Sequence, residues 1–247
     1  VTDWPDFEER GLWNSGLSSP TQLPWLAGMK LNFEHINHPL DFDPDAPRCP
    51  PLPMQHIREA RKRAFHIMPH CWHYDFWSNS PEMRKNYTEL VGKQELARNP
   101  STRANPGYHP EARCPCASSP LLRKLLAEWM ESAAKQGIRE LSLWLTEYQP
   151  STCGCDQCVG EGSHQLVRET RESIHAVQDA QRKYPDLVAR LFITFNVANP
   201  DEEAACREAL AMVPTQETIR VEAVYALQRP LTTTPGQVTG CRTTASP

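Results

Sequence analysis

The feature that most constrains the fold is an alternation of short apolar runs with longer amphipathic segments. Six runs are typical of buried strands, and most are separated by a segment with helix signals. Such alternation builds a parallel sheet, because each helix returns the chain to the start of the next strand. We therefore predict an α/β fold. The predicted strands are 9–14, 29–36, 65–68, a run that begins at 138, 187–195 and 219–227.

Helix signals are clearest between 120 and 136. Ser119 is a suitable N-cap, Pro120 suits the first turn, and Gly137 suits the end. Ser163 is the predicted N-cap of a second long helix that ends at Tyr184. The third strand is expected to stop before Pro69, and residues 78–117 are expected to form a long excursion with little regular structure. Further helices are predicted at 20–27, 54–63 and 199–212.

Six strand–helix units favour a (β/α)₈ barrel of the TIM type that is incomplete in this chain. An open doubly wound sheet is the alternative. It is less favoured because no glycine-rich phosphate loop follows a strand, and Asn14-Ser15-Gly16 is no dinucleotide fingerprint. We expect residues 1–229 to form the barrel and residues 230–247, rich in Thr, Gly, Pro and Ser, to be a disordered or foreign tail.

Composition excludes several classes of function. The chain has 247 residues, enough for one large domain, and its formal net charge of −4 gives no basic footprint for nucleic acid. No apolar run approaches the roughly 20 residues that span a bilayer. No signal peptide is visible, no motif indicates an organic cofactor, and a start at Val1 suggests a processed chain or a fragment of a longer parent.

Functional side chains of a barrel lie at the carboxyl ends of its strands. Here those positions hold imidazoles, amides, aromatic rings and one carboxylate, Glu147. Aromatic faces stack on sugars, and amides and imidazoles bind hydroxyl groups, so the set indicates a carbohydrate site. The expected substrate-binding residues are Trp13, Asn14, His35, His70, Trp72, His73, Tyr148, Asn196 and Tyr225.

Glu147 is the candidate general acid. Glycoside hydrolysis needs a protonated carboxyl group at the leaving oxygen, and burial beside Trp144 and Tyr148 would raise the pKa of Glu147 toward that role. Strand alternation would put Glu147 in one row with the helix-facing leucines of 141–145 unless the strand has already ended; a solvated or salt-bridged strand end is the alternative. The expected partner carboxylate is Asp75, Glu222 or Glu34, or it lies beyond this chain.

The nine cysteines are unevenly spaced. Three fall within six residues, in Cys153-Gly-Cys155-Asp-Gln-Cys158, and can wrap one tetrahedral ion, with Cys114, Cys116 or His164 as fourth ligand. Zinc is the expected ion because saturated thiolate sites select it. A disulfide among these residues and free thiols are the alternatives.

Several passages together resemble a family. Residues 4–13 and 28–35 resemble the first two strands of hexosaminidase-like and α-glucuronidase-like glycoside hydrolase barrels. The motifs at 79–82, 91–93 and 116–120, with the strand that leads into Cys-x-Cys-x-x-Cys, are similar to a subgroup found in polysaccharide-degrading bacteria. The resemblance covers roughly residues 4–227.

The resemblance implies a secreted or periplasmic carbohydrate-active enzyme with its acid on the fourth strand, as one domain of a longer chain. Family 20-type hexosaminidases carry adjacent Asp-Glu there, whereas this chain has Thr146-Glu147. The departure argues against substrate-assisted N-acetylhexosaminidase chemistry and leaves Glu147 as the acid.

The sequence therefore predicts a glycoside hydrolase that acts on a poly- or oligosaccharide by general acid catalysis from Glu147. A structural zinc ion is expected on Cys116, Cys153, Cys155 and Cys158. One alternative function is a non-catalytic carbohydrate-binding barrel. Another is a metal-dependent hydrolase that uses His35, His70 and His73.

Overall fold

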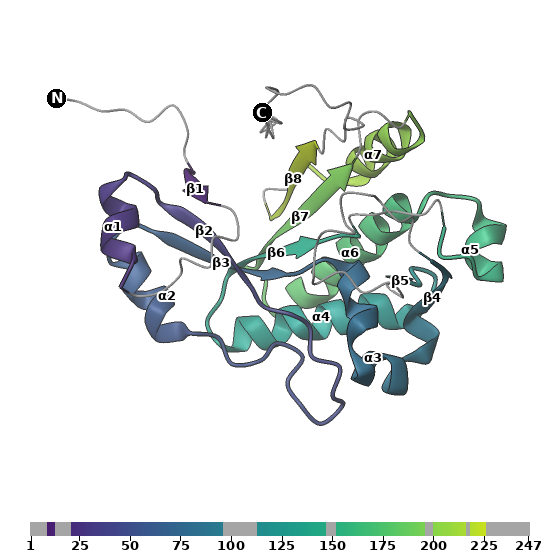
Figure 1. Ribbon diagram of the computed structural model, residues 1–247, viewed down its shortest axis with the longest axis horizontal. Helices are drawn as coiled ribbons and strands as arrows, with labels where there is room; N and C mark the ends of the chain where they lie inside the picture. The colour runs from purple at the N-terminus through teal and green to yellow at the C-terminus, as the bar shows by residue number, and fades with distance from the viewer. Residues whose placement is uncertain are drawn as a thin grey trace, which may run out of the picture.

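A computed structural model describes residues 9–12, 21–95, 113–146, 152–195, 200–215 and 218–225. Its centre is a six-stranded parallel sheet with the strand order β1-β2-β3-β6-β7-β8 (Figure 1). All six predicted strands are therefore present, in the order of the chain. They are β1 (Gly11–Leu12), β2 (Phe33–Asn37), β3 (His66–Cys71), β6 (Glu140–Trp144), β7 (Val188–Phe195) and β8 (Ile219–Tyr225).

Helices connect successive strands, as the alternation predicts. Along one side of the sheet, α4 packs against α6 and α6 packs against α7. The connecting helices are α1 (Leu23–Gly28), α2 (Met54–Arg61), α4 (Pro120–Lys135), α6 (Gln165–Gln181) and α7 (Pro200–Met212). Shorter helices are α3 (Pro81–Asn86), α5 (Asp156–Glu161) and the 3₁₀ turns η1 (Tyr74–Asn79) and η2 (Thr88–Leu90).

The two faces of the sheet differ in chemistry. Alternate residues of β6 and β7, such as Leu143 and Leu191, lie in the main hydrophobic core with the helices. The residues between them, Trp144 and Phe192, form a separate cluster on the opposite, inner face. One face is thus covered by helices, and the other faces the inside of a curved sheet.

Contacts between distant strands show that the sheet curls. His35 Nε2 on β2 lies 3.2 Å from a carboxylate oxygen of Glu222 on β8, although β3, β6 and β7 separate the two strands in the sheet. Glu9, just before β1, bonds Arg190 of β7 at 2.6 Å. A flat sheet would hold neighbouring strands roughly 4.8 Å apart and keep these groups far apart. The fold is a (β/α)₈-type barrel of which six strands lie in the described residues, and chain-ordered strands exclude the doubly wound alternative.

Several local expectations were wrong. β3 does not stop before Pro69 but continues to Cys71, because proline costs one N–H while its fixed φ still suits an extended strand. Residues 78–117 include α3 and an antiparallel pair, β4 (Val91–Glu95) with β5 (Arg113–Pro115). His164, rather than Ser163, is the N-cap of α6, because its Nδ1 accepts from Leu166 N–H.

Two further points concern membrane spans and the predicted domain boundary. Among the described residues, no helix combines the length and apolar content that crossing a membrane requires. The division at residue 229 stays a prediction, because residues 226–247 lie outside the described part of the chain.

Candidate active site and metal centre

Several predicted site residues lie outside the described structure. Glu147 is one of them, so its role stays a prediction. The others are Trp13, Asn14, Tyr148 and Asn196; Tyr225 belongs to β8, but its side chain is not among those described.

The other four predicted binding residues come together. We call His35, His70, Trp72, His73, Phe76, Trp144 and Phe192 the aromatic–histidine cluster. The rings of His35 and His70 lie 4.8 Å apart between centroids, and those of His73 and Trp144 lie 3.4 Å apart. Trp72 stacks on Phe76 at 5.2 Å and packs against the pair Trp144 and Phe192. Strand alternation predicts that Phe192 faces the inside of the sheet, and the register of β6 with β7 pairs it with Trp144. The sequence analysis did not include Phe192 among the site residues.

Burial keeps two imidazoles of this cluster neutral. His70 is 2% exposed and His73 is 4% exposed. Burial lowers the pKa of both well below the ordinary value, and the neighbours His35 and His73 lower the pKa of His70 further. Neutral imidazoles can donate and accept hydrogen bonds, as sugar hydroxyl groups require.

A histidine metal site finds no support in this geometry. Among the described residues, the three histidines His35, His70 and His73 do not form a group with ligand atoms close enough for one ion; the group that does consists of cysteines. The metal-dependent hydrolase alternative therefore loses its expected ligands.

Hydrogen bonds to α6 fix the position of the chain just after β6. The strand ends at Trp144, so the leucine row does not extend as strand to residue 147. Thr146 then donates twice to Glu169 of α6, from its backbone N–H at 2.9 Å and its hydroxyl at 2.7 Å. Gln165 donates to the same carboxyl at 2.8 Å. Glu169 is fully buried, and burial raises its pKa to about 7 against the lowering effect of these hydrogen bonds.

The three acids expected as catalytic partners lie in different environments. Glu222 accepts from Arg190 at 2.8 Å and contacts His35. Burial alone would raise the pKa of Glu222, but His35 and Arg190 outweigh it and lower that pKa, so Glu222 is ionised. Asp75 is buried 3.7 Å from His73, and Glu34 alternates with His35 in β2 and so faces away from the cluster.

Four cysteine side chains, one after β5 and three at or before α5, lie together. The sulfur atoms of Cys116, Cys153, Cys155 and Cys158 all lie within 4.8 Å of one another. Cys116 Sγ is 3.6 Å from the sulfurs of Cys153 and Cys155 and 3.9 Å from that of Cys158. A disulfide measures about 2.05 Å, so these thiols are not bonded to one another. The edge of a tetrahedron with Zn–S bonds of about 2.3 Å is about 3.8 Å, which matches the observed spacings.

Backbone hydrogen bonds hold the cluster between two segments. The N–H groups of Lys93 and Gln94 in β4 both donate to the carbonyl of Cys153 at 2.7 Å. Gly154 has φ of +79°, a left-handed conformation that turns the chain so that Cys155 points toward the same cluster as Cys153. Cys116 supplies the fourth sulfur of the group, as predicted; Cys114 is buried nearby outside it, and His164 caps α6 instead.

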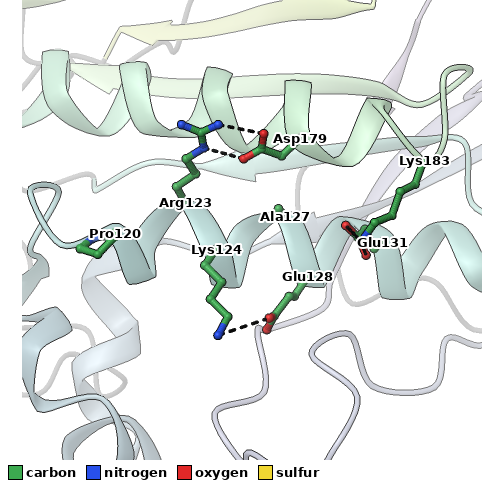
Figure 2. A pocket seen from close by; sticks show the side chains of 8 residues that line it. All are labelled: Pro120, Arg123, Lys124, Ala127, Glu128, Glu131, Asp179 and Lys183. Carbon is green, nitrogen blue, oxygen red and sulfur yellow. Dashed lines mark hydrogen bonds and ion pairs between the residues drawn. The ribbon is translucent and has the colours of Figure 1, made fainter.

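A surface cavity of about 420 Å³ lies between α4 and α6, on the outer side of the helices (Figure 2). Its charged side chains are already paired: Arg123 with Asp179 at 2.8 Å and Lys183 with Glu131 at 2.8 Å. Lys124 lies 3.9 Å from Glu128. None of the described residues that line this cavity is aromatic, in contrast to the aromatic–histidine cluster.

No protein-family model and no curated protein sequence matches the chain. Solved structures do. A mutant of an O-GlcNAc hydrolase from Thermobaculum terrenum matches with a TM-score of 0.55 at 11% identity, over 87% of this chain and 40% of that one. The glycoside hydrolase domain of PelA from Pseudomonas aeruginosa matches with a TM-score of 0.40 at 11% identity, over 81% of this chain and 62% of that one.

The first likeness shows the fold. The chain shares its α/β barrel fold with the O-GlcNAc hydrolase, and it spans 40% of the length of that protein. At this identity the likeness carries no information on which residues react.

Proposed function

We propose that this chain belongs to a glycoside hydrolase that acts on a poly- or oligosaccharide. The observation that carries the proposal is the aromatic–histidine cluster on the inner face of a glycoside-hydrolase-type barrel. Neutral imidazoles and rings at the carboxyl ends of β3 and β6, with Phe192 beside them on β7, are groups that bind sugar hydroxyls and sugar faces. The name of the matched hydrolase, an O-GlcNAc hydrolase, supports the same class of reaction.

In this proposal, Glu147 protonates the leaving oxygen while the glycosidic bond breaks through an oxocarbenium-like transition state. The contacts of Thr146 with Glu169 support the assignment, because they fix the chain at the residue before Glu147. Among Asp75, Glu222 and Glu34, Glu222 is the best partner, because it is ionised and touches the cluster through His35.

Replacing the acid tests the proposal. We expect Glu147→Gln in the intact protein to lower glycosidase kcat by about 10²- to 10⁴-fold, the usual contribution of a general acid, with unchanged thermal unfolding. Turnover is measured on a panel of glycans that includes O-GlcNAc conjugates. Glu208→Gln on the exposed face of α7 is the matched control and should keep full activity.

Turnover in Glu147→Gln equal to that of the wild type would remove Glu147 as the acid. Stabilisation of the wild type by a sugar with no hydrolysis of any glycan would favour the alternative, a non-catalytic carbohydrate-binding barrel.

We further propose that the four cysteines bind one structural zinc ion. Cys116, Cys153, Cys155 and Cys158 saturate a tetrahedral ion, and a saturated thiolate set selects zinc. Zinc would brace the rim of the barrel rather than take part in the reaction, because four protein ligands leave no position for substrate. We also propose a secreted or periplasmic location, on the resemblance of the sequence to carbohydrate-active enzymes.

A further inference from the structure

Arg168 of α6 is a fully buried cation next to the cysteine cluster. Its guanidinium donates to the backbone carbonyls of Cys158, at 3.0 Å, and of Ser163, and to the hydroxyl of Thr152 at 2.8 Å. All three acceptors are neutral. The side chain thus reaches from α6 to both ends of the segment that holds three of the cysteines.

Among the described residues, no carboxylate lies within 4.0 Å of the Arg168 guanidinium. Glu161 of α5 lies near enough for Arg168 to help lower its pKa, but that carboxylate is bound by Arg171 and Ser163. Its neighbour Glu169 is a weak counter-charge, because that carboxyl is engaged by Thr146 and Gln165 and burial raises its pKa to about 7. The position of Arg168 in the first turn of α6 further disfavours its positive charge, since the N-terminus of a helix carries a partial positive charge. A buried cation needs a compensating negative charge.

We infer that Arg168 is the counter-cation of the metal centre formed by Cys116, Cys153, Cys155 and Cys158. The inference rests on the zinc ion proposed above. Four thiolates around one Zn²⁺ carry a net charge of −2, and the carbonyl of Cys158 links the guanidinium directly to a ligand residue. Arg168 is therefore a positioning residue for the metal, which orients and compensates ligands without touching the ion.

A rival explanation is capping alone. Arg168 donates to carbonyls within and just after α5, and a cation there also satisfies the end of that helix. Capping predicts the same loss of stability with and without zinc when the arginine is replaced. Charge compensation predicts that the loss depends on zinc.

The experiment compares Arg168→Gln, which removes the charge but keeps a donor, with Arg168→Lys, which keeps the charge. Zinc affinity is measured by competition with a chromophoric chelator, and thermal unfolding is measured with zinc and after zinc removal. We expect Arg168→Gln to weaken zinc binding about 10- to 100-fold, the usual effect of removing an outer-shell partner, and Arg168→Lys to weaken it less. Arg182→Gln, 73% exposed at the end of the same helix, is the control and should bind zinc as the wild type does.

Wild-type zinc affinity in a folded Arg168→Gln variant would overturn the inference, as would equal losses of stability with and without zinc. A wild type that binds no zinc would remove the zinc proposal itself, which is a different result. If Arg168→Gln does not fold, Arg168→Lys provides the test. A lysine variant that folds and binds zinc supports the need for a positive charge at this position. A lysine variant that does not fold indicates that the shape of the arginine side chain, rather than its charge, is required.

Discussion

Glu169 illustrates how one buried side chain sets the position of a reactive neighbour. Its carboxyl group binds the N–H and hydroxyl of Thr146, the residue before the proposed acid. Burial raises its pKa to about 7, so in the folded protein it keeps its proton over a range in which it is ionised in the unfolded chain. Among the described residues, the polar or titratable groups that interact with it are Thr146, Gln165, Arg168, Cys114 and Tyr74.

Replacing Glu169 should change the pH dependence of stability. The folded state binds more protons than the unfolded state between pH 4.5 and about 7, so the free energy of unfolding falls as pH rises through this window. The fall amounts to about 3 kcal/mol at most. We expect Glu169→Gln, which cannot titrate, to lose this slope in urea unfolding from pH 5 to pH 8. The same slope in both proteins would contradict the assigned pKa.

The positions of single residues could be predicted where the spacing of nearby residues determines them. The Cys-x-Cys-x-x-Cys motif places three sulfurs by itself, because they lie within one turn of chain and the start of α5. Spacing alone did not single out the fourth ligand, Cys116, from Cys114 and His164, because Cys116 follows β5 and reaches the group through the long-range pairing of β5 with β4 and of β4 with Cys153. The role of Arg168 was missed because a buried arginine within an amphipathic helix gives no signal in the sequence.

At the scale of elements, the β4–β5 hairpin supports the cysteine cluster. Gly92 lies so close to the partner strand that an added Cβ would be 2.5 Å from the Cys114 carbonyl oxygen and 3.2 Å from its sulfur. Backbone cannot move away as a flexible side chain can. Only glycine therefore fits at this point of the hairpin.

We expect Gly92→Ala to lower the free energy of unfolding by about 1–3 kcal/mol, the cost of overpacking, and to weaken zinc retention. Gly160→Ala in α5 is the control: nothing lies within 4 Å of the added Cβ. Alanine there should be neutral or stabilising by about 0.5–1 kcal/mol. Thermal unfolding and bound-metal analysis check both, and equal stability of the two variants would refute the close contact.

Elements with strong end signals were predictable. Ser119 accepts from the N–H of Leu121 and Pro120 begins α4, as expected, because caps and prolines act locally. The hairpin was missed because residues 96–112 separate its strands, and no short turn motif announces the pairing. The continuation of β3 through Pro69 was missed because tertiary pairing outweighs the preference of one residue.

At the scale of the whole molecule, ion pairs on the inner face of the sheet connect strands that are far apart within it. The Arg190 guanidinium binds Glu9 at 2.6 Å, Glu140 at 2.7 Å and Glu222 at 2.8 Å, and its side chain is 6% exposed. These acids come from the segment before β1, from β6 and from β8. One cation therefore joins the first and last described strands through the interior.

We expect Arg190→Met to lower the free energy of unfolding by about 3–5 kcal/mol, because three acids would be left without their shared cation. Arg207→Met removes an exposed pair with Glu203 on α7 and should cost less than about 1 kcal/mol. Chemical denaturation measures both. A small effect of Arg190→Met would mean that the curl of the sheet does not depend on this network.

The alternation predicted the strand order and the barrel class, but it did not predict which side-chain contacts curl the sheet. The alternation predicts six strands in chain order, since a helical segment separates most of the successive apolar runs. The contacts that curl the sheet, such as Glu222 with His35, join residues that no local pattern relates.

Cys116 and Cys158 stand on either side of a stretch that contains α4 and β6. A metal bound to both closes that stretch into a ring. If a peptide bond between Thr146 and Thr152 were cut, the ion would join the two pieces by coordination, in addition to the pairing of β6 with β7 and the packing of α4 on α6.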